Sequence, residues 1–240
     1  MRIVTNQKTV KQKQRIAMWT SIGGLGLLVV AFVLSLPAVT AGNPTLALVA
    51  WPVALVGLLI ATVGTYHVNR WVRPPRAHEA LAEALKGLDN RHILYNYLGP
   101  VPHLLLSPRG LFALAVKRYD GPARYVDGKW VGKFSLRRLY GQGLTAEGLG
   151  NPNQEIEAQT AAVERWLRKE LPDEAEKIPV ASVAVFINPA VQLDAGDNPA
   201  PIATIKTVKR ALQRDFFPGV KQMPRDAYNA LMEELGDQAS

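Results

Sequence analysis

The first third of the chain contains two long apolar runs separated by a short turn. No Asp, Glu, Lys or Arg occurs from residue 16 to residue 69, which is enough chain for two membrane crossings of about 20 residues each. We place the helices at residues 16–39 and 45–66, joined by the turn Thr40-Ala-Gly-Asn-Pro44. Backbone polar groups find no partner in lipid, so each crossing must be helical. The pattern therefore predicts a transmembrane helical hairpin.

Basic residues flank the two predicted spans but are absent from the turn between them. Five precede the first span and three follow the second: Arg2, Lys8, Lys11, Lys13, Arg15, Arg70, Arg73 and Arg76. Lys and Arg near span ends favour the cytoplasmic side. We therefore expect a basic cytoplasmic arm at residues 1–15 and a multi-pass protein of the plasma (inner) membrane with both termini and the soluble domain in the cytoplasm. A secretory signal peptide is the alternative interpretation, and the second span that follows directly argues against it.

Small residues form one ridge along the second predicted span. Gly57, Ala61 and Thr65 are spaced four residues apart, and such ridges allow helices to approach closely in membranes. The ridge can pack against the small residues of the first span, or it can dock a second membrane protein. We favour the first interpretation, with the lipid bilayer as the partner of the other faces.

Beyond residue 75 the apolar residues recur at the spacings of amphipathic helices and short strands, as in a soluble domain. Apolar residues at helical spacing predict helices at residues 76–86, 204–214 and 224–235. A further helix is predicted to begin at Pro152, with Asn151 as its N-cap. Short apolar runs predict strands at residues 93–98, 103–106, 111–116 and 180–187, and Asp127-Gly128 predicts a hairpin turn. This order indicates an α/β fold, a mixed sheet flanked by helices, preceded by the transmembrane α-hairpin.

The charge distribution and the cysteine content limit the functions that this chain can have. The net charge is +8, but five of the positive charges belong to the basic arm. Residues 70–240 carry 23 basic groups against all 20 acidic groups, so this part is only mildly basic. The absence of cysteine excludes disulfides, zinc-thiolate sites and thiol catalysis.

Several short motifs of the soluble part occur in a recognisable order. They are His78-Glu79, Leu104-Leu-Leu-Ser-Pro-Arg-Gly-Leu-Phe112, Ala115-Val-Lys117 followed by Gly121, and Asn151-Pro152. Together they resemble the nuclease-related domain (NERD) family, a branch of the PD-(D/E)xK nuclease-like fold, over residues 76–190. The resemblance implies a restriction-endonuclease-like sheet, and it leaves residues 191–240 as a C-terminal helical extension.

The resemblance also implies a catalytic site from which this sequence departs. In the family, an Asp on one strand and a Glu on the next bind a divalent cation, and a Lys two residues after the Glu assists the attacking water. Here Pro102 stands at the Asp position and Ala115 at the Glu position, while Glu79 and Lys117 match the helix carboxylate and the Lys. Mg²⁺ requires hard oxygen ligands, so we expect a vestigial site of Glu79 and Lys117 with no metal and no cofactor.

Three functions follow from these observations. The first is a catalytically inactive, membrane-anchored nuclease-like domain, a pseudoenzyme that acts as a binding or scaffold module or as an accessory subunit of a membrane complex. The second is a Mg²⁺-dependent nuclease whose carboxylates have migrated to Asp120, Glu155 and Glu79. The third is a nucleic-acid-binding module without cleavage, which we do not favour.

A run of basic residues follows Lys117. Its members are Arg118, Arg124, Lys129, Lys133, Arg137 and Arg138. Such a cluster can contact the phosphates of a nucleic acid, or it can face the anionic lipids of the inner leaflet. The sequence leaves both interpretations open.

Overall fold

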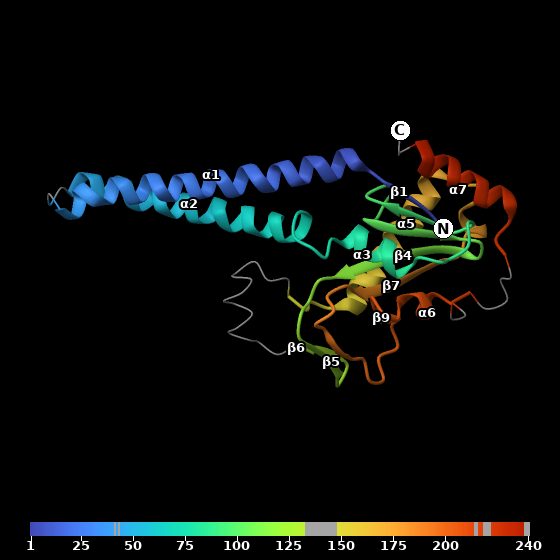
Figure 1. Cartoon of the computed structure of the whole chain (residues 1–240). Helices are drawn as coiled ribbons and strands as arrows, with labels where there is room; N and C mark the ends of the chain where they lie inside the picture. The colour runs from blue at the N-terminus through green and yellow to red at the C-terminus, as the bar shows by residue number, and fades with distance from the viewer. Residues whose placement is uncertain (41, 43, 133–147, 214–215, 218–221, 238–240) are drawn as a thin grey trace. The chain divides into compact units, whose positions relative to one another are not determined.

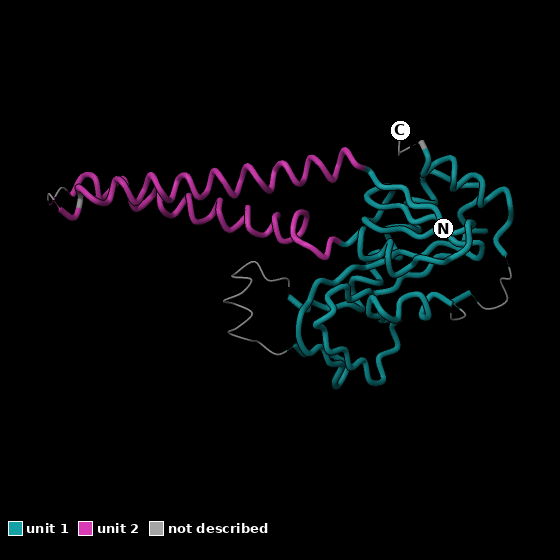
Figure 2. Tube along the Cα trace, viewed as in Figure 1, with its two compact units in different colours: residues 1–6, 77–134, 147–240 teal, residues 7–76, 135–146 magenta. Residues whose placement is uncertain are grey.

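The structure, a computed structural model, describes the chain except for residues 41, 43, 133–147, 214–215, 218–221 and 238–240. The chain divides into two compact units, coloured separately in Figure 2. One unit contains residues 7–76. The other combines residues 1–6 with the described residues beyond 76.

The first unit is a pair of long helices. Helix α1 (Gln7–Thr40) and helix α2 (Pro44–Trp71) are both long and apolar enough to cross a membrane. The predicted helices are confirmed, and each extends further than its apolar run. Large apolar side chains project outward from both helices, for example Val39 and Leu59, which are 82% and 68% exposed.

Glycines allow close packing between α1 and α2. A Cβ atom placed on Gly64 would lie 2.6 Å from the backbone nitrogen of Ser21, and one on Gly57 would lie 3.0 Å from the Cβ of Leu27. A Cβ on Gly24 would overlap the backbone of Ala61. Gly57 and Ala61 therefore face the first helix, which confirms that this part of the small-residue ridge packs within the hairpin.

The second unit is built on a six-stranded mixed sheet (Figure 1). Its strand order is β1 (Arg2–Thr5), β2 (Ile93–Asn96), β3 (His103–Ser107), β4 (Gly110–Lys117), β7 (Val180–Phe186) and β9 (Ile202–Thr204). Strands β2, β3 and β4 pair antiparallel, and the remaining neighbours pair parallel. The sequence-based prediction of a mixed sheet flanked by helices is confirmed.

Helices cover both faces of this sheet. On one face, the apolar side chains of α5 (Pro152–Glu170) and α7 (Arg225–Asp237) pack against alternate residues of β3 and β4, such as Leu104 and Leu111. On the other face, α3 (Ala77–Ala84) and α6 (Val208–Leu212) pack against Leu105 and Phe112. Strand β4 is therefore buried on both sides, as its continuous apolar run predicted.

A smaller sheet extends from the end of β4. It consists of β6 (Lys129–Gly132), β5 (Pro122–Val126) and β8 (Gln192–Asp194) in that order. Asp127 and Gly128 join β5 to β6 with φ angles of 50° and 78°. Two positive φ angles in a two-residue turn favour Asp-Gly and match the twist of the hairpin, so the predicted hairpin is confirmed.

The structure differs from the sequence analysis at both ends of the chain. The segment expected to be a basic arm is divided, because residues 2–5 form edge strand β1 and α1 begins at Gln7. The segment expected to be a helical extension is not helical throughout. It supplies β8 to the smaller sheet and β9 to the larger one, before the short helix α6 and the longer helix α7. The missed strands β1, β8 and β9 are three or four residues long and pair with strands distant in sequence, so local periodicity gives little sign of them. Between α5 and β7, the chain also forms a 3₁₀ turn, η2 (Ala175–Lys177).

Candidate functional site

The site suggested by the sequence lies where β4 ends beneath α5. Side chains alternate along a strand, so Ala113, Ala115 and Lys117 point to the same face. Ala113 packs with α5 residues of the core, and Ala115 is fully buried against Ile156 and the neighbouring-strand residue Ala184. The position that the sequence resemblance aligns with the family's strand Glu is therefore occupied by apolar packing.

Lys117 forms an ion pair with Glu155. Its Nζ atom donates a hydrogen bond of 2.6 Å to Oε1 of Glu155, in the first turn of α5. The Lys117 side chain is 5% exposed and the Glu155 side chain is 40% exposed. A nearly buried ammonium is thus neutralised by a carboxylate that still contacts solvent.

Gly150 lets the backbone pass close to this ion pair. Its φ angle is +61°, a left-handed conformation that suits glycine. A Cβ atom there would lie 3.1 Å from Oε1 of Glu155 and 3.3 Å from Nζ of Lys117. The loop before α5 therefore closes over the pair, and a larger residue at position 150 would crowd it.

The start of α5 is held in place by side-chain hydrogen bonds. The Asn151 side chain caps the helix by accepting from the backbone nitrogens of Asn153 and Gln154, as the sequence predicted. The Asn153 side chain accepts from Trp130 Nε1 at 2.9 Å and donates to Asn198 Oδ1 at 2.8 Å. Strand β6 and the loop after β8 thereby fix the turn that carries Glu155.

The other candidate residues are spread more widely. Glu79 is exposed in the first turn of α3, the helix that packs on the opposite face of the sheet from α5. Asp120 is half-buried in the loop after β4. Of the basic run, Arg118 is half-buried, and Arg124 and Lys129 are exposed on the β5–β6 hairpin. Lys133, Arg137 and Arg138 lie outside the described residues.

The sequence analysis missed a polar row that crosses three strands. His103 Nδ1 lies 2.8 Å from Asn96 Oδ1, and Asn96 Nδ2 donates to Thr5 Oγ1 at 3.1 Å. The ring of Tyr97, a residue with a φ of +60°, contacts the rings of His78 and His103 at centroid distances of 5.7 and 5.1 Å. The row ties edge strand β1 into the sheet on the α3 face. Its members are up to 91 residues apart, so no local pattern connects them.

The described residues do not fit the divalent cation of the nuclease family. Mg²⁺ is held through carboxylate oxygens, but Ala115 offers no side-chain ligand and Glu155 is engaged by Lys117. Among the residues that the structure describes, no group of three or more His, Cys, Asp or Glu could bind a metal ion.

The second unit is a mixed α/β domain in which a helix crosses between the parallel strands β4 and β7 and a lysine ends strand β4, an architecture consistent with a nuclease-like fold. Residues 76–187 match the family model of the nuclease-related domain, NERD. The chain thus carries a nuclease-related domain, and the resemblance noted from its motifs is confirmed. No curated protein and no solved structure gave a significant match.

Proposed function

We propose that this protein is a membrane-anchored nuclease-related protein whose domain does not cleave nucleic acid. The domain acts instead as a binding or scaffold module, or as an accessory subunit of a membrane complex. The observation that carries the proposal is the Lys117–Glu155 ion pair next to the buried Ala115, at the position where the family binds its metal.

The electrostatics of this position support a non-catalytic domain. A divalent ion loses strongly bound water on entering a site, and carboxylate charge must compensate for that loss. The two strand positions that supply this charge in the family are Pro102 and Ala115 here. The Glu155 carboxylate already neutralises the nearby Lys117 ammonium, so its charge is not available to compensate a divalent cation.

Two observations support the membrane anchor. In the most apolar 18-residue stretch of each helix, only 17% of the residues of α1 and 11% of those of α2 are buried. The core helix of a soluble protein is, in contrast, mostly buried. In addition, β1 precedes α1 and pairs with β2, which follows α2. The chain segments that precede and follow the helix pair therefore belong to one sheet, as a hairpin that returns to the same side of the membrane requires. Cleavage of α1 as a signal peptide would remove β1 from that sheet.

We expect no Mg²⁺- or Mn²⁺-dependent cleavage of DNA or RNA by the purified protein. The full chain in mild detergent is the appropriate sample, because a fragment that begins after α2 would lack β1. Single-stranded DNA, double-stranded DNA and RNA, each labelled at one end, would be incubated with either metal and analysed on denaturing gels.

Lys117→Ala provides the decisive comparison for that assay. Cleavage by the unmodified protein that disappears in Lys117→Ala would overturn the proposal, because it would assign a catalytic role to this lysine. Cleavage that persists unchanged in the variant would not involve Lys117 and would have to be traced to another site of the chain or to a contaminant. Retention of uncleaved DNA that weakens steeply with salt would favour a nucleic-acid-binding module over a protein scaffold.

The proposed orientation predicts which positions reagents can reach from outside the cell. The chain contains no cysteine, so single cysteines can be introduced at Gly42, in the turn between the helices, and at the exposed Arg165 of α5. A membrane-impermeant maleimide should label Gly42→Cys in intact cells and Arg165→Cys only after lysis. Labelling of Arg165→Cys in intact cells would show that the domain lies outside.

A further inference from the structure

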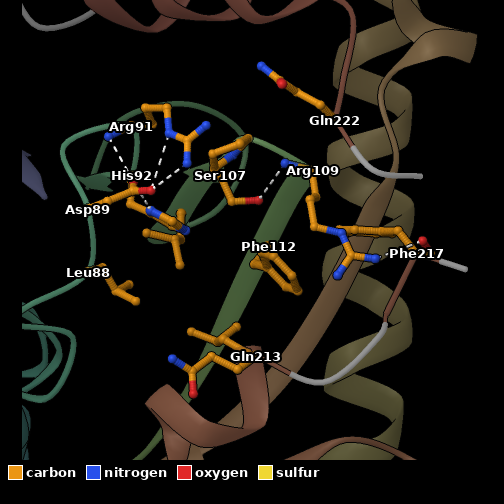
Figure 3. A pocket seen from close by; sticks show the side chains of 13 residues that line it. Leu88, Asp89, Arg91, His92, Ser107, Arg109, Phe112, Gln213, Phe217 and Gln222 are labelled. Atoms are coloured by element: carbon orange, nitrogen blue, oxygen red, sulfur yellow. Dashed lines mark hydrogen bonds and ion pairs between the residues drawn. The ribbon is translucent and has the colours of Figure 1, made fainter. Parts of the chain in front are cut away.

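A pocket of about 250 Å³ lies at the end of the sheet opposite the Lys117–Glu155 pair (Figure 3). It opens beside the turn between β3 and β4, and Phe112 of β4 forms part of its wall. Phe112 and Lys117 are five residues apart, or about 17 Å along a strand, and their side chains point to opposite faces of the sheet. The pocket is therefore separate from the nuclease-related position.

The inner wall of the pocket is apolar and aromatic. Leu105 and Phe112 are nearly fully buried, and Phe217 closes the far side. The rings of Phe112 and Phe217 lie 5.2 Å apart at an interplanar angle of 46°. Where this wall borders the cavity, a planar ligand can make the edge or tilted contacts that aromatic groups favour.

Charged groups surround this wall on two sides. Figure 3 shows Asp89, Arg91 and His92 on one side of Phe112 and Arg109 towards the other. Asp89 Oδ2 accepts from Arg91 Nη2 at 2.8 Å, and its Oδ1 lies 2.7 Å from His92 Nδ1. Arg109 Nη2 donates to the carbonyl oxygen of Phe217 at 3.0 Å. These contacts hold both guanidinium groups near the pocket.

The charge balance of the pocket favours an anion. Among the described residues that line the pocket, Asp89 is the only acid, and Arg91 and Arg109 are both basic. Counting His92 as neutral, these described lining residues carry a net charge of +1. Hydrogen bonds from Arg91 lower the pKa of Asp89 to about 2, so the carboxylate stays ionised and keeps Arg91 in position. The Arg91 side chain is nevertheless 64% exposed, which leaves it accessible to a ligand.

We propose that this pocket binds a small organic anion composed of one planar apolar ring and one phosphate or carboxylate group. The ring would lie against Phe112 and Phe217, and the anionic group would meet Arg91 at the rim. The volume of about 250 Å³ lies just below the usual range of ligand pockets, which fits a single ring. A site with this chemistry does not depend on whether the nuclease-related position cleaves nucleic acid.

Titration with phenyl phosphate tests the proposal directly. The full chain in detergent micelles would be titrated and binding followed by calorimetry and by phosphorus NMR. We expect saturable binding with a Kd of about 1 mM or tighter. Inorganic phosphate lacks the ring and benzyl alcohol lacks the charge, so each should bind at least about tenfold more weakly.

Two variants and a control assign that binding to the pocket. Arg91→Gln removes the anion contact at an exposed position and should weaken binding about tenfold. Leu88→Trp places an indole in the pocket and should abolish binding. Arg165→Gln removes an exposed arginine of α5, outside the lining of the pocket, and should leave affinity unchanged.

Three outcomes would overturn the proposal. They are the absence of saturable binding, equal affinity for inorganic phosphate, and binding that survives both Arg91→Gln and Leu88→Trp. If circular dichroism shows that Leu88→Trp is unfolded, undiminished binding by Arg91→Gln alone overturns the proposal. None of these results bears on nuclease activity, so this inference and the proposed function can fail independently.

Discussion

Glu155→Gln is expected to lower the free energy of unfolding of the α/β unit by about 3 kcal/mol, because it leaves the Lys117 ammonium buried without a counter-charge. Lys117→Met should cost much less, within about 1 kcal/mol, since it removes the buried charge and leaves a carboxylate that water can reach. The asymmetry follows from the exposed fractions of the two side chains, 5% for Lys117 and 40% for Glu155. Denaturant titration of the full chain in micelles, followed by circular dichroism, measures both changes.

Glu157→Gln is a matched control for that comparison. Glu157 is an exposed carboxylate on the same helix, two residues further on, so its replacement should change stability by no more than about 0.5 kcal/mol. Equal losses in Glu155→Gln and Lys117→Met would contradict the asymmetric burial of the pair. Equal losses in Glu155→Gln and Glu157→Gln would mean that the ion pair contributes nothing.

Gly24→Leu is expected to separate the two long helices. A side chain at Gly24 would overlap the backbone of Ala61, and its Cβ would lie 2.6 Å from the Ala61 Cα. Backbone atoms of a helix cannot move aside locally, so the helices must part along the contact, at a cost of about 3 kcal/mol or more. Unfolding of the hairpin in mixed micelles of increasing SDS content, followed by tryptophan fluorescence, would report the loss.

Gly23→Leu supplies the control on the adjacent residue. A Cβ atom at Gly23 meets nothing within 4 Å, so leucine there should leave hairpin stability within about 0.5 kcal/mol of the unmodified chain. If Gly24→Leu unfolds at the same SDS content as Gly23→Leu, the helices do not pack through Gly24.

The sequence predicted those parts of the fold that depend on local patterns. The charge-free run indicated the two long helices, continuous apolar runs indicated β4 and β7, and Asn151-Pro152 indicated the start of α5. Each of these signals is contained in a few consecutive turns or residues. Short edge elements such as β1 and β9 were missed because their stability comes from a neighbouring strand and not from their own composition.

The candidate site, too, could be predicted from the sequence only in part. The residues at positions 102 and 115 could be read from the motif alone, so the loss of the two strand carboxylates was already evident in the sequence. The partner of Lys117 was not. The sequence suggests Glu155 only as a migrated metal ligand, whereas the structure pairs it with Lys117. That pairing depends on how α5 crosses β4, which Trp130 and Asn153 help to fix.

The apolar hairpin, the α/β class and the missing metal-binding carboxylates can all be predicted from the sequence, because they depend on residue type and short-range spacing. Three features emerge only from the folded domain: the place of β1 in the sheet, the neutralisation of Lys117, and the aromatic pocket between Arg91 and Arg109. Each of these joins residues far apart in the chain. Their contacts form only when the packing of the whole domain brings them together.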